Sequence, residues 1–167
     1  MKKVYDYTLP RKALYKVAIF VGVLAGVVNT YLEIDFTLRP MLFVCLLSAI
    51  VIVVSFHEAV HGLIATLLGH KPLFGFKPPL VYITFTGKIP RNHFILVALA
   101  PLVLLDVLFG YLYIRGLFKL FFDFCLIINT IGALGDVWIV LMLLNAEKAS
   151  LIQDTKNGFE VWVADEI

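Results

Sequence analysis

Two histidines and a glutamate stand at a spacing that suits metal-assisted hydrolysis: His57, Glu58 and His61, in the order His-Glu-x-x-His. On a helix, residues i and i+4 lie one turn apart on the same face, so both imidazoles can bind one zinc ion. The carboxylate between them is then placed to act as general base on a metal-activated water. The alternative is a polar helix end that holds no metal.

The composition indicates that this motif sits in a membrane protein. Hydrophobic residues make up 61% of the 167-residue chain, against about 45–50% in soluble domains. The mean hydropathy is +0.95. The sixteen residues before the motif, 41–56, hold no ionisable side chain except Cys45. The net charge of +2, without a basic cluster, excludes nucleic acid as an expected partner, and the lipid bilayer is the expected surrounding.

Four apolar segments are long enough to cross a bilayer. They cover residues 13–31, 41–69, 93–114 and 117–144. The basic N-terminus before the first segment invites comparison with a signal peptide, but we interpret the segment as a retained span. We therefore predict an all-α integral membrane protein with four transmembrane helices, forming a single domain over residues 1–167.

Short β-structure is expected outside the spans. Residues 80–86 are β-prone and end at Gly87, which predicts a strand or hairpin in the loop between the second and third helices. This hairpin either lies on the surface or dips into the membrane beside the motif. The tail carries a turn signal at 156–158, followed by a short strand or amphipathic segment at 159–163.

Charge predicts the orientation of the spans. Eleven of the 14 Lys and Arg residues precede the first span, lie in the middle loop or lie in the tail, and Arg39, Arg115 and Lys119 lie on the opposite side. The positive-inside rule then places both termini and the middle loop in the cytoplasm of a multi-pass protein of the cell membrane.

Depth in the membrane predicts the third metal ligand, which a catalytic zinc site still needs. With Arg39 at the outer interface, a rise of about 1.5 Å per residue puts His57 roughly 27 Å down. With Lys119 at the same interface, Asp136 is about 26 Å down. Two separate spans thus bring polar residues to one level, and Asp136 is the predicted third ligand.

Three other polar residues have open roles. Asp106 lies about 22 Å above Arg91, at the wrong level for this site, and is interpreted as a polar contact, with an ion pathway as alternative. His93 lies at a plausible depth and is a rival ligand, a substrate or oxyanion contact, or an interfacial residue. Asn129 shares a helical stripe with Asp136 and would contact a substrate carbonyl or the oxyanion, or else bond a neighbouring helix.

With these residues in hand, the chain resembles a family of small bacterial and archaeal membrane proteins named as predicted zincin peptidases. The matching motifs cover most of the chain from the second span onward. They are His57–Gly62, Gly69 with Pro72 and Phe74–Phe76, Ala100–Leu102, Asn129 with Gly135–Asp136, and Asp154–Phe159.

The core is more distantly similar to the site-2 proteases, which cleave peptide bonds within membranes. This resemblance implies His57, His61 and Asp136 as zinc ligands and Glu58 as base. The chain departs from that pattern in reading Gly135–Asp136 where those proteases have Asp-Gly, and in a shorter spacing from Asn to Asp.

The predicted function is that of a membrane-embedded zinc metalloendopeptidase that cleaves a membrane protein or peptide substrate. Hydrolysis takes place within the bilayer or at its cytoplasmic edge, by zinc-activated water with Glu58 as general base. Residues 80–86 are expected to hold the substrate as an added strand. The alternative is a non-catalytic metal-binding scaffold or regulatory protein, in which four protein groups close the zinc sphere.

Overall fold

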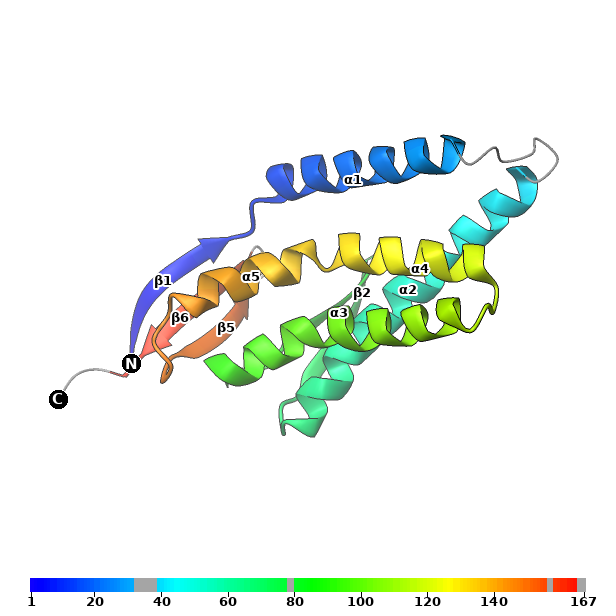
Figure 1. The fold of residues 1–167 in the computed structure, drawn as a ribbon. Coiled ribbons are helices and arrows are strands. Elements are labelled where there is room, and N and C mark those ends of the chain that lie inside the picture. Colours follow the sequence, from blue (N-terminus) through cyan, green and yellow to red (C-terminus); the bar gives the residue numbers. More distant parts are fainter. Residues whose placement is uncertain (32–38, 78–79, 156–157, 165–167) are drawn as a thin grey trace. The chain divides into compact units, whose positions relative to one another are not determined.

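The computed structural model describes residues 1–31, 39–77, 80–155 and 158–164 (Figure 1). The chain forms two compact units, each built from separate segments. Unit 1 comprises Met1–Leu9, Glu58–Pro101 and Gly135–Ile167, and unit 2 comprises Pro10–His57 and Leu102–Leu134. The expectation of a single domain stays a prediction.

In the described part of the chain, five helices account for most of the apolar sequence. They are α1 (Arg11–Tyr31), α2 (Arg39–Leu67), α3 (Arg91–Ile114), α4 (Lys119–Gly132) and α5 (Leu134–Leu144). Within unit 2, α1 lies beside α4.

Three helical segments of the described chain are long and apolar enough to cross a membrane, which marks this as a membrane protein. They are Phe43–Leu67, Arg91–Ile114 and Lys119–Leu144. The first span, expected at 13–31, coincides with α1. It stays a prediction, because the side chains of residues 23–31 lie outside the described part of the chain.

Glycines end two of the long helices. Gly69, with a φ of 82°, follows α2, and the N–H of His70 donates to the Ala65 carbonyl at 2.9 Å. The N–H of Gly69 itself donates to the Thr66 carbonyl at 3.0 Å, which completes a Schellman cap. Gly116, with a φ of 77°, ends α3 in the same way. Both stops depend on a left-handed backbone that glycine adopts without strain.

The described residues also form six strands, which make up two antiparallel sheets. The four-stranded sheet has the order β1-β6-β5-β4, and β2 pairs with β3 in a hairpin. The strands are β1 (Lys2–Thr8), β2 (Pro72–Lys77), β3 (Leu80–Phe85), β4 (Lys88–Pro90), β5 (Leu151–Thr155) and β6 (Gly158–Val163).

The prediction of an all-α protein with one loop hairpin and a short tail is therefore wrong. The hairpin expected at 80–86 is present as β2 and β3, and the tail segment expected at 159–163 lies within β6. The missed strands are short and pair with distant segments, for example Tyr7 with Phe159. Such pairing leaves no local periodicity for a sequence pattern to detect. Lys156 and Asn157 of the predicted tail turn lie outside the described residues.

The four-stranded sheet joins the N-terminal strand β1, the loop strand β4 and the tail strands β5 and β6. Strands that share one hydrogen-bonded ladder lie on one side of a membrane, because open sheet edges do not occur in its hydrocarbon region. The N-terminal strand, the middle loop and the tail therefore meet in one sheet.

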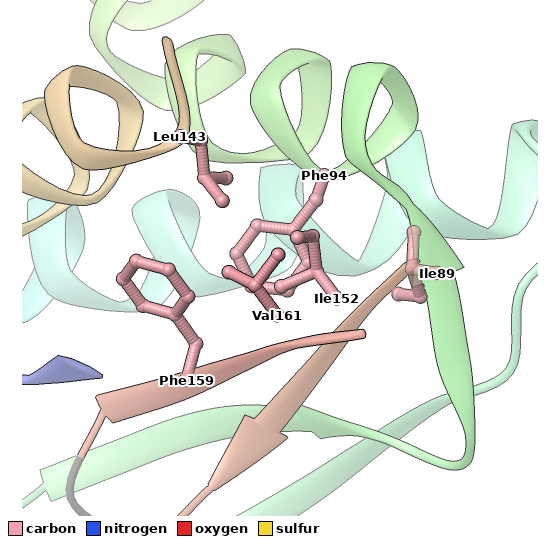
Figure 2. Packing of buried hydrophobic residues seen from close by; sticks show 6 residues of the cluster. All are labelled: Ile89, Phe94, Leu143, Ile152, Phe159 and Val161. Atoms are coloured by element: carbon pink, nitrogen blue, oxygen red, sulfur yellow. The ribbon is translucent and has the colours of Figure 1, made fainter. Parts of the chain in front are cut away.

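A hydrophobic core holds unit 1 together (Figure 2). Its buried side chains come from β4, α3, α5, β5 and β6, and they fill the space between the strands and the helices. They are Ile89, Phe94, Leu143, Ile152, Phe159 and Val161. The ring of Phe159 lies at the centre of an aromatic cluster, 5.0 Å from Tyr7, 6.0 Å from Trp138 and 6.5 Å from Phe94 between ring centroids.

Arg91 ties the start of α3 to the end of α5. Its side chain is 7% exposed, and its Nε donates to the Leu143 carbonyl at 2.6 Å. A second guanidinium nitrogen donates to the Leu144 carbonyl at 3.3 Å. Carbonyls in the last turn of a helix have no partner within it, so the buried guanidinium completes this helix end.

Replacing Phe159 by alanine is expected to lower the free energy of unfolding by about 3–5 kcal/mol, because it leaves a cavity where four rings meet. Denaturant titration in detergent, followed by tryptophan fluorescence, measures this loss. Phe76→Ala removes the same atoms from a side chain that is 70% exposed and should change stability by less than about 1 kcal/mol. Equal losses in the two variants would contradict the assignment of the core.

Candidate metal centre and its pocket

The His-Glu-x-x-His residues lie on α2, as the sequence predicts. His57 is 8% exposed, and the His61 side chain is 12% exposed. His61 lies about one helical turn after His57 in an unbroken helix, so the two rings project from the same face.

Hydrogen bonds orient the ring of His61. Its Nδ1 lies 2.8 Å from the carbonyl oxygen of Val97 on α3. A carbonyl only accepts, so Nδ1 carries the proton and Nε2 keeps its lone pair. That Nε2 lies 3.6 Å from Oδ2 of Asp136, in the first turn of α5. His61 thus turns its second ring nitrogen, Nε2, toward a carboxylate, an arrangement suited to sharing a cation.

A chain of three side chains in unit 2 orients His57. Oδ1 of Asn129 lies 2.9 Å from His57 Nδ1, and Asn129 Nδ2 donates to Asp106 at 2.9 Å. The Asp106 carboxylate also accepts from the Thr130 hydroxyl at 3.3 Å. Since a carboxylate accepts these bonds, it fixes the amide with its oxygen toward His57, which then donates from Nδ1. His57 Nε2 is thereby left as the ligand atom.

These donors can hold one metal ion. His57 directly precedes unit 1 in the unbroken helix α2. It lies one helical turn before His61, and His61 and Asp136 both belong to unit 1. Ligands bound at about 2.0–2.2 Å to a tetrahedral zinc are about 3.3–3.5 Å apart. The 3.6 Å between His61 and Asp136 is close to that value, and two imidazoles with one carboxylate form a donor set that zinc accepts.

Glu58 lies beside this donor set, in a pocket of unit 1 with a volume of about 160 Å³. Its Oε2 accepts a hydrogen bond of 3.0 Å from the backbone N–H of Ile83 on β3. The pocket is lined by Glu58, His61, Tyr82, Ile83, Phe85, Phe94, Val97, Ala98, Asp136, Ile139 and Asp154. The predicted base, Glu58, and two of the three predicted ligands, His61 and Asp136, therefore line one cavity.

Gly62 allows the β2–β3 hairpin to approach α2 beside Glu58. A Cβ added at this position would lie 2.7 Å from Cζ of Phe74 and 3.0 Å from Cδ1 of Ile83. Any larger residue at position 62 would displace the ends of these two side chains, one of which belongs to the residue whose N–H binds Glu58. The glycine that follows His61 thus has a packing role, which the sequence motif alone does not reveal.

His93 is placed away from this pocket lining. Its Nδ1 lies 3.0 Å from Nε2 of His70, and the two rings meet edge to face. Burial, with a smaller contribution from His93, lowers the pKa of His70 below its usual value, which favours the neutral ring. The roles predicted for His93 as ligand or oxyanion contact stay predictions.

Asp106 of the third predicted span and Asn129 of the fourth form a hydrogen bond with each other. Asp106 has the polar contact expected for it, and its partner is Asn129. Both ends of the Asn129 amide have protein partners, while its expected oxyanion role stays a prediction. The stripe from Asn129 to Asp136 is interrupted at Ala133, where α4 ends and α5 follows.

Sequence reasoning missed two polar residues of the pocket, Asp154 on β5 and Tyr82 on β3. Burial raises the pKa of Asp154, although hydrogen bonds from the Thr84 side chain and the Thr155 backbone oppose the rise. The signal was present in the tail motif that runs from Asp154 to Phe159. Its place in the pocket depends on long-range strand pairing, which the motif does not show.

Comparison of the sequence with known protein families identifies the class of this protein. The model of the DUF3267 family, described as "Putative zincin peptidase", matches residues 49–151, and the chain belongs to this family. The matched range covers α2 from residue 49 onward, the hairpin, β4, α3, α4 and α5. Membership makes this a zincin-type protein, for which zinc is the implied metal.

A relative is found in Pyrococcus woesei, an "Uncharacterized 24.7 kDa protein in gap 5'region". It is 24% identical over 157 residues, covering 90% of this chain and 70% of the relative. No solved structure matches the chain.

Proposed function

We propose that this protein is a membrane-embedded zinc metalloendopeptidase that cleaves membrane protein or peptide substrates within the bilayer or at its cytoplasmic edge. The observation that carries the proposal is the 3.6 Å between His61 Nε2 and Oδ2 of Asp136, with Glu58 in the same pocket. His57 lies one helical turn before His61 on the unbroken helix α2. Family membership points to the same chemistry.

In this proposal each side chain has a separate task. His57 and His61 hold the metal through Nε2, and Asp136 holds it through its carboxylate. When bound, zinc supplies a Lewis acid that polarises the peptide carbonyl and makes water a stronger acid. Glu58 accepts the proton of the attacking water and delivers it to the leaving amine. Val97 and Asn129 keep the two imidazoles in the required tautomer.

The outer edge of β3 is a suitable place for an extended substrate. In an antiparallel ladder the N–H and C=O of one residue point to the same edge. The Ile83 N–H donates to Glu58, so the Ile83 carbonyl also faces away from β2 and toward the pocket. A substrate strand added here would have its backbone next to the general base, and an extended backbone is the form that a peptidase can attack.

Ile83→Pro is expected to lower peptide hydrolysis by about 10–100-fold and to leave zinc content unchanged. Proline removes the N–H that holds Glu58, and a hydrogen bond to a charged group is worth about 1.5–3 kcal/mol. Because this N–H is not part of the β2–β3 ladder, the hairpin should persist. Ile83→Val keeps the N–H and serves as the control. Full activity in the proline variant would leave β3 without a role in positioning the base.

The sheet and the charges together support the proposed membrane placement, because open sheet edges do not occur in the hydrocarbon region. If α2 crosses the bilayer, β1 and β4 can share one sheet only when the chain crosses once more between them, and α1 is the helix available for this. This parity supports the four-span prediction. The concentration of Lys and Arg on the side of the sheet supports a cytoplasmic location for both termini and the middle loop.

The direct test is hydrolysis of quenched fluorescent peptides by purified protein in detergent or liposomes. Protein stripped with a chelator should be inactive and should recover on addition of one equivalent of zinc. Protein that binds zinc with four protein ligands and cleaves nothing would instead establish the non-catalytic scaffold.

A further inference from the structure

The pocket contains a carboxylate that the proposed mechanism does not use. Glu58 is the proposed base and Asp136 a proposed ligand, while Asp154 enters the same cavity from β5. Asp154 pairs with Phe159 of β6, and the preceding Gln153 also pairs with Lys88 of β4, so the sheet positions the backbone at Asp154. A carboxylate placed rigidly beside reacting groups is suited to contacting the substrate.

Asp154 has hydrogen bonds but no cationic partner among the described residues. The Thr84 side chain and the Thr155 backbone supply its hydrogen bonds. Among the described residues that line the pocket there is no Lys or Arg, and the one basic side chain is His61, which lies beside Asp136. A largely buried carboxylate loses hydration that a nearby positive charge would offset, and burial here already raises the pKa of Asp154.

The rest of the lining suits the carbon stem of a long cationic side chain. Six of the lining residues are apolar: Ile83, Phe85, Phe94, Val97, Ala98 and Ile139. Lysine and arginine place their methylene groups against apolar surface while the charged head contacts an acid. A bound divalent metal would offset the charge of Asp136, so the charge of Asp154 would remain for a second cation.

We propose that Asp154 is a specificity residue, which binds a positively charged group of the peptide substrate close to the bond that is cleaved. The group is an ammonium or guanidinium, supplied either by a Lys or Arg side chain or by a free N-terminal amine. This inference rests on the proposed peptidase function. It adds a substrate class, peptides with a positive charge near the scissile bond.

The test uses full-length, zinc-loaded protein carrying Glu58→Gln, which should bind peptides without cleaving them. Fluorescence anisotropy compares one labelled peptide with three variants: Lys replaced by norleucine, the amine acetylated, and both changes together. We expect the charged peptide to bind at least about tenfold more tightly than the doubly neutral one, and the two single changes identify the source of the charge.

Asp154→Asn in the same background should remove this preference, since the amide can still accept a hydrogen bond from Thr84 but carries no charge. Asp6→Asn is the matched control, because it removes an exposed carboxylate of the same sheet. A preference that survives in Asp154→Asn, equal affinity for all four peptides, or binding of none of them would overturn the proposal.

Cleavage by the enzyme with Glu58 intact separates this proposal from the one on which it rests. Cleavage of charged and neutral peptides at equal rates would remove the role of Asp154 and leave the peptidase standing. Charge-dependent binding without any cleavage would keep the role of Asp154 in binding and refute the peptidase.

Discussion

Glu58→Gln is expected to bind zinc as tightly as the wild-type protein and to lose peptide hydrolysis by about 10²–10⁴-fold, the contribution typical of a positioned general base. The amide has nearly the same size, and its oxygen can still accept the hydrogen bond from the Ile83 N–H. It cannot take a proton from water. The measurement combines metal analysis with initial rates on quenched peptides.

The control for this variant is Glu147→Gln, which makes the same change at an exposed residue outside the pocket lining. It should retain full activity. If Glu58→Gln kept its turnover, another group would have to serve as base. If it lost zinc as well as activity, Glu58 would hold the metal, and the division of tasks between Glu58 and Asp136 would be wrong.

Asp136→Ala should weaken zinc binding more than any change around the ligands, because it deletes one of three metal-binding groups. Asp106→Ala should weaken zinc binding by about 10–100-fold, the effect typical of residues that orient a metal-bound histidine. Its influence passes through Asn129, whose amide it keeps turned toward His57. Competition with a fluorescent zinc chelator gives both dissociation constants.

A second pair of variants checks this order of effects. Asp106→Asn can itself donate and no longer fixes the Asn129 amide, so it should also weaken zinc binding, although less than Asp136→Ala. Asp123→Asn changes a carboxylate of α4 outside this hydrogen-bonded chain and should bind zinc normally. If Asp106→Ala lost more zinc affinity than Asp136→Ala, Asp136 would not be the third ligand.

The local parts of the site followed from the sequence because helix geometry is regular. His57 and His61 face one way because four residues make nearly one turn. Asp136 could be predicted as the third ligand because the rise per residue is constant, so two spans that start at the same interface bring His57 and Asp136 to the same depth. The structure brings Asp136 to 3.6 Å from His61, although a break at Ala133 interrupts the assumed single helix.

The parts that sequence reasoning missed depend on long-range contacts. The sequence places Lys2 and Lys3 on the flank of the first predicted span. In the structure they begin the strand Lys2–Thr8, which forms by pairing with residues 158–163. Asp154 reaches the pocket only because β5 is held by that sheet. The hydrogen-bond partners of Asn129 lie on other helices, and residue spacing along its own helix does not predict which polar groups come within 3 Å.

The zinc content of chelator-free, detergent-purified wild-type protein tests the central claim most directly. We predict about one zinc per chain, lost after His61→Ala and after Asp136→Ala but kept after Glu147→Gln. Wild-type protein that neither contains zinc nor takes it up from a buffered zinc solution would contradict the account, and the His57–His61 helix would then be a polar segment without a metal.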